Sequence, residues 1–226
     1  DSLGNESIAL FFQDHVVDES VEYFAVTRAG KLAPDTVTYM PSVSLRVPGR
    51  GADILVVTPS DTLGREALRD WIDWRENQGT HVVTANLDSI YAEFNYGIPS
   101  PSAIRDFFRF AASEWNPAPR FVLLVGDGVL NYRSAASRFH VIPSPFYHTM
   151  KLGGAASDHW YTLLDGDDEP DLAIGHLPVR SQAELTTVVS KIIEYEQSPP
   201  SAWRNRYLMI NGGSTTDIFT TQIQSL

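Results

Sequence analysis

The sequence of 226 residues contains no cysteine. This absence excludes disulfides, thiolate metal sites and a cysteine nucleophile within these residues. Long apolar runs are missing as well, since no stretch reaches the ~18 apolar residues that a membrane-spanning helix needs. We therefore expect no membrane span. Basic side chains are also scarce, and only three residues are lysines, Lys31, Lys151 and Lys191.

The excess of acidic over basic side chains limits the partners that the protein can have. Asp and Glu number 28 against 17 for Lys and Arg, which gives a formal net charge of −11. Nucleic acids and anionic membranes repel such a field, so we exclude both as general partners. Hydrophobic residues make up 43% and charged residues 20% of the chain, as in ordinary packed globular proteins.

The first fifty residues differ in pattern from the rest of the chain. Residues 21–27 alternate enough for a strand, residues 36–45 can form another, and residues 47–51 form a linker-like break. We predict a small β-rich lead-in segment over residues 1–50 and a main domain over residues 51–226.

From Ala52 onward, apolar runs alternate with amphipathic stretches. The apolar runs predict buried strands at residues 53–58, 81–85, 121–125, 172–175 and 207–210. Helical spacing of apolar residues predicts helices that start at Asp61 or Thr62, at Ser102 and at Ser181. This alternation predicts an α/β fold of three layers around a doubly wound, mostly parallel sheet. Residues 129–161 have weak periodicity, and we predict them to be mostly loop.

Ligands of such sheets bind beyond the carboxyl ends of the strands, which makes Asp127 a candidate site residue after the strand 121–125. An acidic side chain there can hold a metal ion or accept a proton. It can also tie down the following loop by accepting backbone N–H groups. A metal phosphohydrolase centred on Asp127 is the weakest interpretation, because no second acidic cluster lies at a neighbouring strand end.

A loop after Leu164 carries carboxylates at alternate positions, which are Asp165, Asp167, Glu169 and Asp171. Alternating oxygen ligands of this kind surround Ca²⁺ in calcium-binding loops. The loop is not an EF-hand, because its glycine is the second residue instead of the sixth and no glutamate occupies the twelfth position. The alternative is a solvated acidic turn without a metal ion.

Sequence motifs of several other enzyme classes are absent. The chain has no HExxH, GxSxG, GxxxxGK[ST] or GxGxxG pattern. Each histidine taken alone is therefore interpreted as structural or exposed, and the six are His15, His81, His140, His148, His159 and His176. Reasoning from the residues alone ends at an acidic three-layer α/β domain with a candidate calcium loop.

Several sequence blocks, in order along the chain, resemble the gingipain family of cysteine peptidases. The most distinctive blocks are residues 121–128 (FVLLVGDG), 157–161 (SDHWY) and 173–180 (AIGHLPVR), and the resemblance runs from about Ala52 to Ile218. It implies a caspase-like fold, protein or peptide substrates, and secretion to the cell surface or beyond. It also implies hydrolysis by a cysteine thiolate with a histidine as base.

The same resemblance implies roles for residues near the end of the chain. The cysteine and histidine of the family lie downstream of this sequence. Asn211 stands where relatives carry an acidic residue before Gly-Gly, and it would orient that histidine. Asp217 stands near the pocket carboxylate of arginine-specific relatives, which pairs with a basic substrate side chain, although a helix N-cap is the alternative. Structural calcium in the family favours Ca²⁺ at the acidic loop.

We therefore expect the amino-terminal part of a secreted, calcium-stabilised, gingipain-like cysteine endopeptidase. The last residues, 222–226, have the pattern of the first turns of a helix, so we expect the domain to be incomplete at its C-terminus. Without the cysteine and histidine, the chain alone is predicted to be inactive. The alternative is a non-catalytic calcium-binding surface domain with the same fold, which a missing cysteine or histidine downstream would favour.

Overall fold

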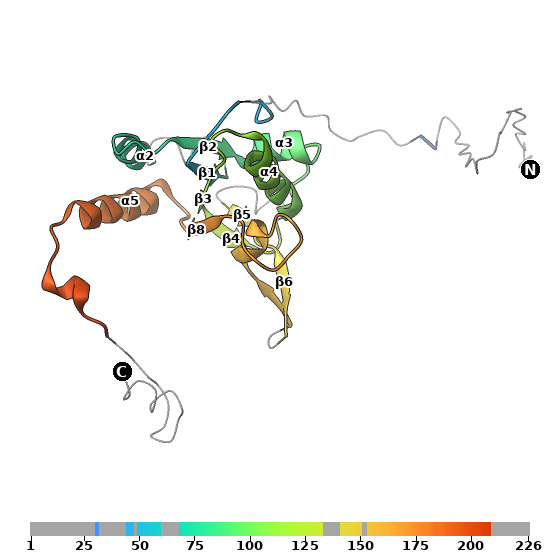
Figure 1. Ribbon diagram of the computed structural model, residues 1–226. Coiled ribbons are helices and arrows are strands. Elements are labelled where there is room, and N and C mark those ends of the chain that lie inside the picture. Colours follow the sequence, from blue (N-terminus) through green and yellow to red (C-terminus); the bar gives the residue numbers. More distant parts are fainter. Residues whose placement is uncertain are drawn as a thin grey trace, which may run out of the picture. The chain divides into compact units, whose positions relative to one another are not determined.

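The computed structural model describes residues 30–31, 44–47, 49–59, 68–132, 141–150 and 153–208. The chain divides into two compact units, residues 1–39 and 40–226. Only Gly30 and Lys31 of the first unit are described, so most of the predicted β-rich lead-in lies outside the described residues. All described helices and strands belong to the second unit (Figure 1).

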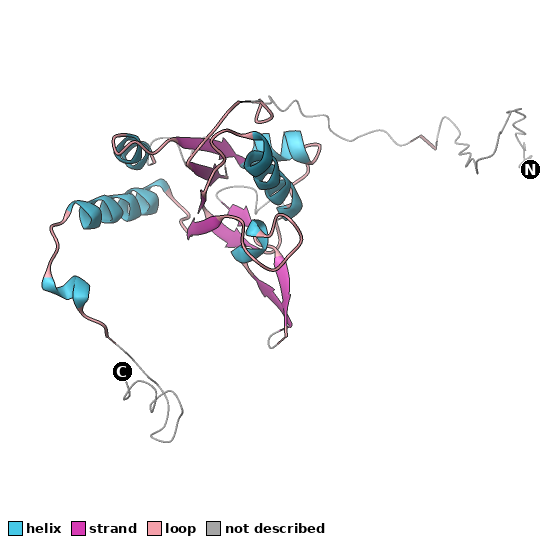
Figure 2. Ribbon diagram, in the orientation of Figure 1, coloured by secondary structure: helices cyan, strands magenta, loops and turns pink. Residues whose placement is uncertain are grey.

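A parallel four-stranded sheet runs through the second unit (Figure 2). Its strands, in spatial order, are β2 (Val82–Asn86), β1 (Ile54–Thr58), β3 (Phe121–Val125) and β8 (Ala173–Leu177). Each lies within two residues of a predicted strand. The prediction succeeds because strands covered on both faces carry nearly continuous apolar runs.

Helices cover both faces of this sheet, which confirms the predicted three layers (Figure 1). One layer contains α2 (Arg69–Glu76) and α5 (Gln182–Gln197), and the other contains α3 (Leu87–Phe94), α4 (Pro101–Glu114) and the 3-10 helix η2 (Asp158–Thr162). Successive strand residues point to opposite faces. Val56 accordingly packs in the core with Leu185 of α5, whereas Leu55 packs in the core with Phe107 of α4.

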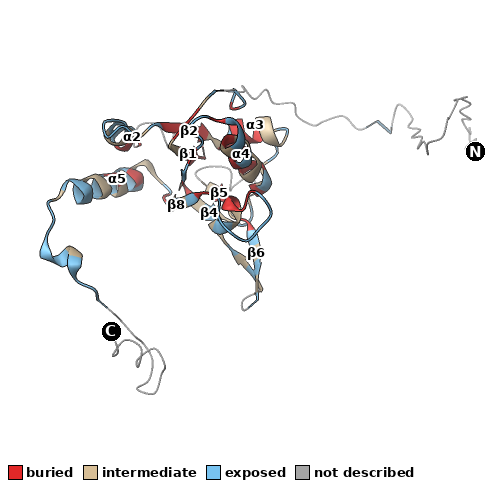
Figure 3. Ribbon diagram, in the orientation of Figure 1, coloured by how far each residue is buried: buried red, intermediate tan, exposed pale blue. Residues whose placement is uncertain are grey.

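The core on the α3–α4 face is rich in aromatic rings. The ring centroids of Phe107 and Trp115 lie 5.7 Å apart, and those of Phe108 and Tyr161 lie 6.1 Å apart. Figure 3 shows buried residues concentrated where α3 and α4 meet the sheet. Tyr161 belongs to η2, and its hydroxyl donates to the carbonyl of Pro143. These contacts hold η2 against α4 and so fix the residues that η2 carries.

A short segment ahead of β1 is part of the same core. Leu45 is 1% exposed, and its N–H donates to both carboxylate oxygens of Glu93, at 2.8 and 2.9 Å. The N–H of Arg46 reaches the same carboxylate at 3.2 Å. The Arg46 guanidinium lies 4.1 Å from the ring centroid of Phe94. Glu93 on α3 therefore holds this segment through its backbone while Leu45 fills the core.

The stretch predicted to be mostly loop contains several short elements. They are β4 (Asp127–Val129) paired in parallel with β5 (Val141–Pro143), the antiparallel hairpin of β6 (Phe146–Thr149) and β7 (Gly153–Ala156), and η2. Strands of three or four residues give too few positions for a period to be recognised, and β7 consists only of glycine and alanine.

The helix boundaries differ in part from the prediction. Helix α3 was not predicted, although Asn86 caps it by accepting the N–H of Ser89 at 2.8 Å. Helix α4 is capped by Ser100, two residues before the predicted cap. The predicted cap Ser181 of α5 is confirmed, with its Oγ accepting the N–H of Glu184 at 3.2 Å. Residues 60–67, where the first predicted helix starts, lie outside the described residues. The 3-10 helix η3 (Ala202–Asn205) follows α5.

Candidate functional site

The carboxyl ends of β3 and β8 lie side by side, because the strands pair in parallel with Leu124 opposite His176 and Val125 opposite Leu177. Gly126 follows β3 with a φ of +135°, a conformation that glycine adopts more easily than other residues. Its N–H donates to the carbonyl of Leu177 at 3.0 Å. The turn after β3 is thereby fixed to the end of β8.

His176 joins this turn to η2. Its Nδ1 lies 2.7 Å from Oδ2 of Asp158, and its Nε2 lies 2.6 Å from the carbonyl oxygen of Gly126. Burial alone lowers the pKa of His176, but the hydrogen bonds to Asp158 and Gly126 outweigh it, and the pKa is raised above its usual value. The charged imidazole, held between a carboxylate and a carbonyl, therefore persists to a higher pH than that of a free histidine.

Asp127 uses both of its carboxylate oxygens within the protein. Oδ2 accepts from Nε of Arg180 at 2.6 Å, and Oδ1 accepts from the N–H of Gly128 at 3.0 Å. The backbone N–H of Arg180 in turn donates to Glu184 at 2.7 Å. This geometry matches the interpretation in which Asp127 ties down the loop. Among the described residues, no group of three or more His, Cys, Asp or Glu is placed to hold a metal ion.

The acidic loop makes hydrogen bonds to its own backbone. Asp165 accepts from the N–H of Asp167 at 3.2 Å, Asp167 accepts from the N–H of Glu169 at 2.8 Å, and Asp171 accepts from the N–H of Leu164 at 2.8 Å. In the described conformation no three of these carboxylates share a metal-binding arrangement. Calcium at this loop stays a prediction.

Two residues singled out by sequence, Asn211 and Asp217, lie outside the described residues. Of the predicted strand 207–210, Tyr207 and Leu208 are described, and they are exposed and form no strand, whereas residues 209–210 lie outside the described part of the chain. The described part of the site is therefore the edge formed by the turn after β3, the end of β8 and η2.

Peptidase family C25 matches residues 47–226, which cover the whole described sheet. The chain belongs to this family of cysteine peptidases. Lys-gingipain of Porphyromonas gingivalis is 24% identical over 156 residues, which cover 67% of this C25 chain and 8% of the relative. Lys-gingipain W83 of the same species is 24% identical over 153 residues, 66% of this chain. The C25 chain thus spans about 8% of the length of these curated relatives.

A solved structure shares the fold of this C25 chain. The crystal structure of dimeric latent PorU from Porphyromonas gingivalis aligns with a TM-score of 0.50 and 24% identity, covering 68% of this chain and 16% of that one. The likeness supports the caspase-like α/β fold expected from sequence. In the described part of the C25 chain, no helix is both long and apolar enough to cross a membrane.

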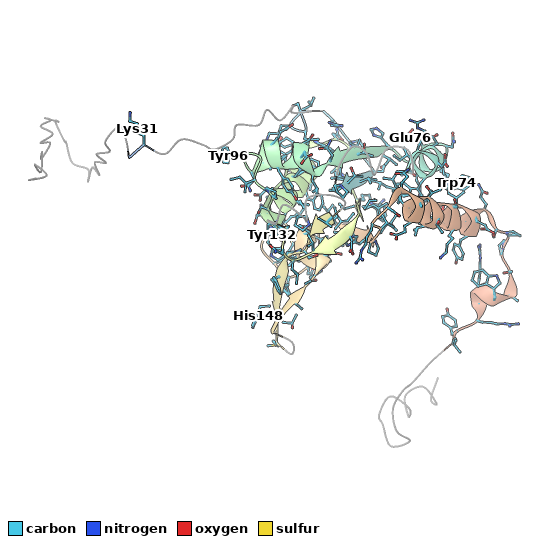
Figure 4. The ribbon with its side chains drawn as sticks, turned by 180° about the vertical axis from the view of Figure 1, so that it is seen from behind. Lys31, Trp74, Glu76, Tyr96, Tyr132 and His148 are labelled. Carbon is cyan, nitrogen blue, oxygen red and sulfur yellow. The ribbon has the colours of Figure 1, made fainter. Side chains whose placement is uncertain are left out.

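Sequence reasoning missed the pairing of His176 with Asp158 in the C25 chain. The two residues are 18 positions apart and belong to different sequence blocks, so no local spacing reveals the contact. The available signal was that both blocks, 157–161 and 173–180, carry the family resemblance. The other described histidines, His81, His148 and His159, are exposed, which agrees with their interpretation as structural or exposed, and Figure 4 shows His148 on the β6–β7 hairpin.

Proposed function

We propose that this chain supplies the first part of the catalytic domain of a secreted, gingipain-like cysteine endopeptidase that cleaves proteins or peptides. The observation that carries the proposal is the match to peptidase family C25 over residues 47–226. Because the sequence contains no cysteine, the nucleophile has to come from outside these residues. That thiolate would attack the peptide carbonyl, and a histidine would move the proton to the leaving amine.

In this proposal Asn211 orients the catalytic histidine. Its side-chain carbonyl accepts the imidazole N–H, which fixes the ring, but it adds no charge to stabilise an imidazolium. Asn211→Ala should lower kcat at least about tenfold, the loss expected for one hydrogen bond of ~1.4 kcal/mol. Asn211→Asp should raise kcat. Asn205→Ala is the matched control, and equal effects at both positions would contradict the role of Asn211.

Asp217 is proposed to lie in the pocket for the substrate residue before the cleaved bond. A carboxylate there pairs with arginine or lysine, so Asp217→Asn should lower kcat/KM for basic substrates more than for neutral ones. An N-cap role predicts a different result, namely about 1 kcal/mol of lost stability with unchanged substrate preference. Kinetics on paired peptides together with urea unfolding separates the two roles.

The decisive experiment compares the full-length protein with the present chain on peptides that carry arginine or lysine at the cleaved bond. We expect cleavage by the full-length protein, its loss after thiol alkylation, and no cleavage by the chain alone. A full-length protein that has both the cysteine and the histidine but cleaves nothing would overturn the enzyme proposal. The non-catalytic calcium-binding surface domain would then be the better assignment.

Secretion is the second part of the proposal. The acidic charge of the chain suits an extracellular protein that has to stay soluble in salt. Fractionation of the source cells with an antibody to this chain tests the assignment. Recovery in the medium or on the cell surface supports it, and recovery only in the cytoplasm contradicts it.

A further inference from the structure

Both ring nitrogens of His176 face hydrogen-bond acceptors. Nδ1 lies 2.7 Å from the carboxylate of Asp158, and Nε2 lies 2.6 Å from the carbonyl oxygen of Gly126. A carbonyl oxygen and an ionised carboxylate both accept hydrogen bonds and neither donates. Both contacts can be hydrogen bonds at the same time only when both ring nitrogens carry hydrogen, that is, in the imidazolium form of His176.

We propose that His176, as an imidazolium, is a positioning residue that ties the turn after β3 to η2, and that loss of its proton releases one of these contacts. These contacts join parts of the chain that are distant in sequence, since Asp158 and Gly126 lie 18 and 50 residues from His176. The turn carries Asp127 at the carboxyl edge of the sheet, where ligands of such folds bind.

Charged groups from several elements face the imidazole. Asp158 on η2 is hydrogen-bonded to it, and Asp127 on β4 acts on it through space. Arg180, which follows β8, pairs with Asp127 at 2.6 Å and partly offsets that carboxylate. Tyr161 on η2 is buried, and burial raises the pKa of its hydroxyl, so it stays neutral. The surroundings of His176 thus contain two anions and one cation, which favours its protonated form.

The pH dependence follows from the direction of the shift. Burial works against the charged form, yet the contacts with Asp158 and Gly126 raise the pKa of His176 overall. A group whose pKa is higher in the folded than in the unfolded state stabilises the fold below its unfolded pKa, and this contribution is lost as pH rises through the folded value. We expect His176 to keep both contacts, with Asp158 and with Gly126, in mildly acidic solution and to lose one of them in alkaline solution.

The first test uses the full chain without substitution. NMR of the imidazole nitrogens at about pH 6 should show His176 protonated on both nitrogens. Hydrogen exchange should show the amide of Gly126, which donates to Leu177, losing protection between about pH 6 and pH 9 after correction for intrinsic rates. A neutral ring at the lower pH, or protection that does not change with pH, overturns the proposal.

Substitutions separate the charge from simple packing. His176→Arg keeps a cation with several N–H donors at every pH, so it should retain protection at Gly126 and abolish its pH dependence. His176→Gln should lose protection at every pH. The matched control His159→Gln, an exposed neighbour on η2, should behave as wild type.

A further variant serves if the substitutions at His176 prevent folding. Asp158→Asn removes the hydrogen-bonded carboxylate and should move the pH midpoint of the exchange transition to lower values. An unchanged midpoint overturns the proposal.

The inference depends on the proposed function in one respect, namely that the edge formed by the turn after β3, the end of β8 and η2 lies at the catalytic site. In the active full-length enzyme, kcat should fall on the alkaline side, and His176→Arg should flatten that fall. The NMR and exchange results can agree with the proposal while kcat does not change with the protonation of His176. In that case His176 still links the turn after β3 to η2, but this edge of the sheet has no catalytic role.

Discussion

At the scale of single residues, the turn after β3 depends on two neighbours that contribute in different ways. Gly126 provides a backbone conformation with φ at +135°, and His176 provides N–H donors on both sides of its ring. The conformation belongs to the backbone itself, so it persists at any pH. The donors depend on a proton, so their contribution changes with pH. Substitutions at the two positions should therefore differ in their pH dependence.

Replacing Gly126 tests the backbone contribution. Gly126→Ala forces a residue with a Cβ atom into a positive-φ conformation, and we expect a loss of about 1–3 kcal/mol in the free energy of unfolding. Urea unfolding measures it. Gly175→Ala is the matched control, because an added Cβ there would lie 3.5 Å from Leu123, an ordinary contact. Equal losses for both variants would contradict the backbone explanation.

At the scale of elements, two interactions hold the segment before β1 against α3: backbone hydrogen bonds to Glu93 and burial of the Leu45 side chain. The carboxylate of Glu93 accepts the N–H groups of Leu45 and Arg46, while the Leu45 side chain enters the core that α4 lines. Backbone capture and side-chain burial act together here. The α3–α4 layer is therefore complete only when residues 44–46 are in place.

Truncating the buried side chain tests this contribution. Leu45→Ala removes a fully buried leucine, and we expect a loss of about 2–5 kcal/mol in the free energy of unfolding. Val47→Ala is the control, since Val47 is 44% exposed and its truncation should cost less than about 0.5 kcal/mol. Thermal and urea unfolding of both variants measure the difference. A Leu45→Ala protein as stable as Val47→Ala would show that the segment is dispensable.

At the scale of the whole molecule, calcium binding would appear as added stability. A ligand at a hundred times its Kd stabilises a folded protein by about 2.7 kcal/mol. If the acidic loop binds Ca²⁺, the melting temperature should rise with Ca²⁺, fall with EDTA, and stop responding in Asp167→Asn. Mg²⁺ and Asp73→Asn, an exposed change on α2, are the controls. No response of the wild type would leave the loop with only its local hydrogen bonds.

Features that depend on adjacent residues could be predicted from the sequence, whereas contacts between distant residues could not. The apolar run of β3 identifies a buried strand from five adjacent residues, Phe121–Val125. The hairpin of β6 and β7 left no such signal, because its strands are short and mostly small or polar. Asp127 was found because it lies two residues after the end of β3, next to Gly126. The contact of His176 with Asp158 depends on η2 packing against α4, which no spacing in the sequence encodes.

The position of Leu45 has a practical consequence for recombinant work. The family match begins at residue 47, two residues after this buried side chain. A gene fragment trimmed to the family boundary would encode a protein with a void in its larger core and a Glu93 carboxylate stripped of its backbone donors. Such a protein should express poorly and aggregate, whereas one that starts a few residues earlier, at Met40, keeps the core filled.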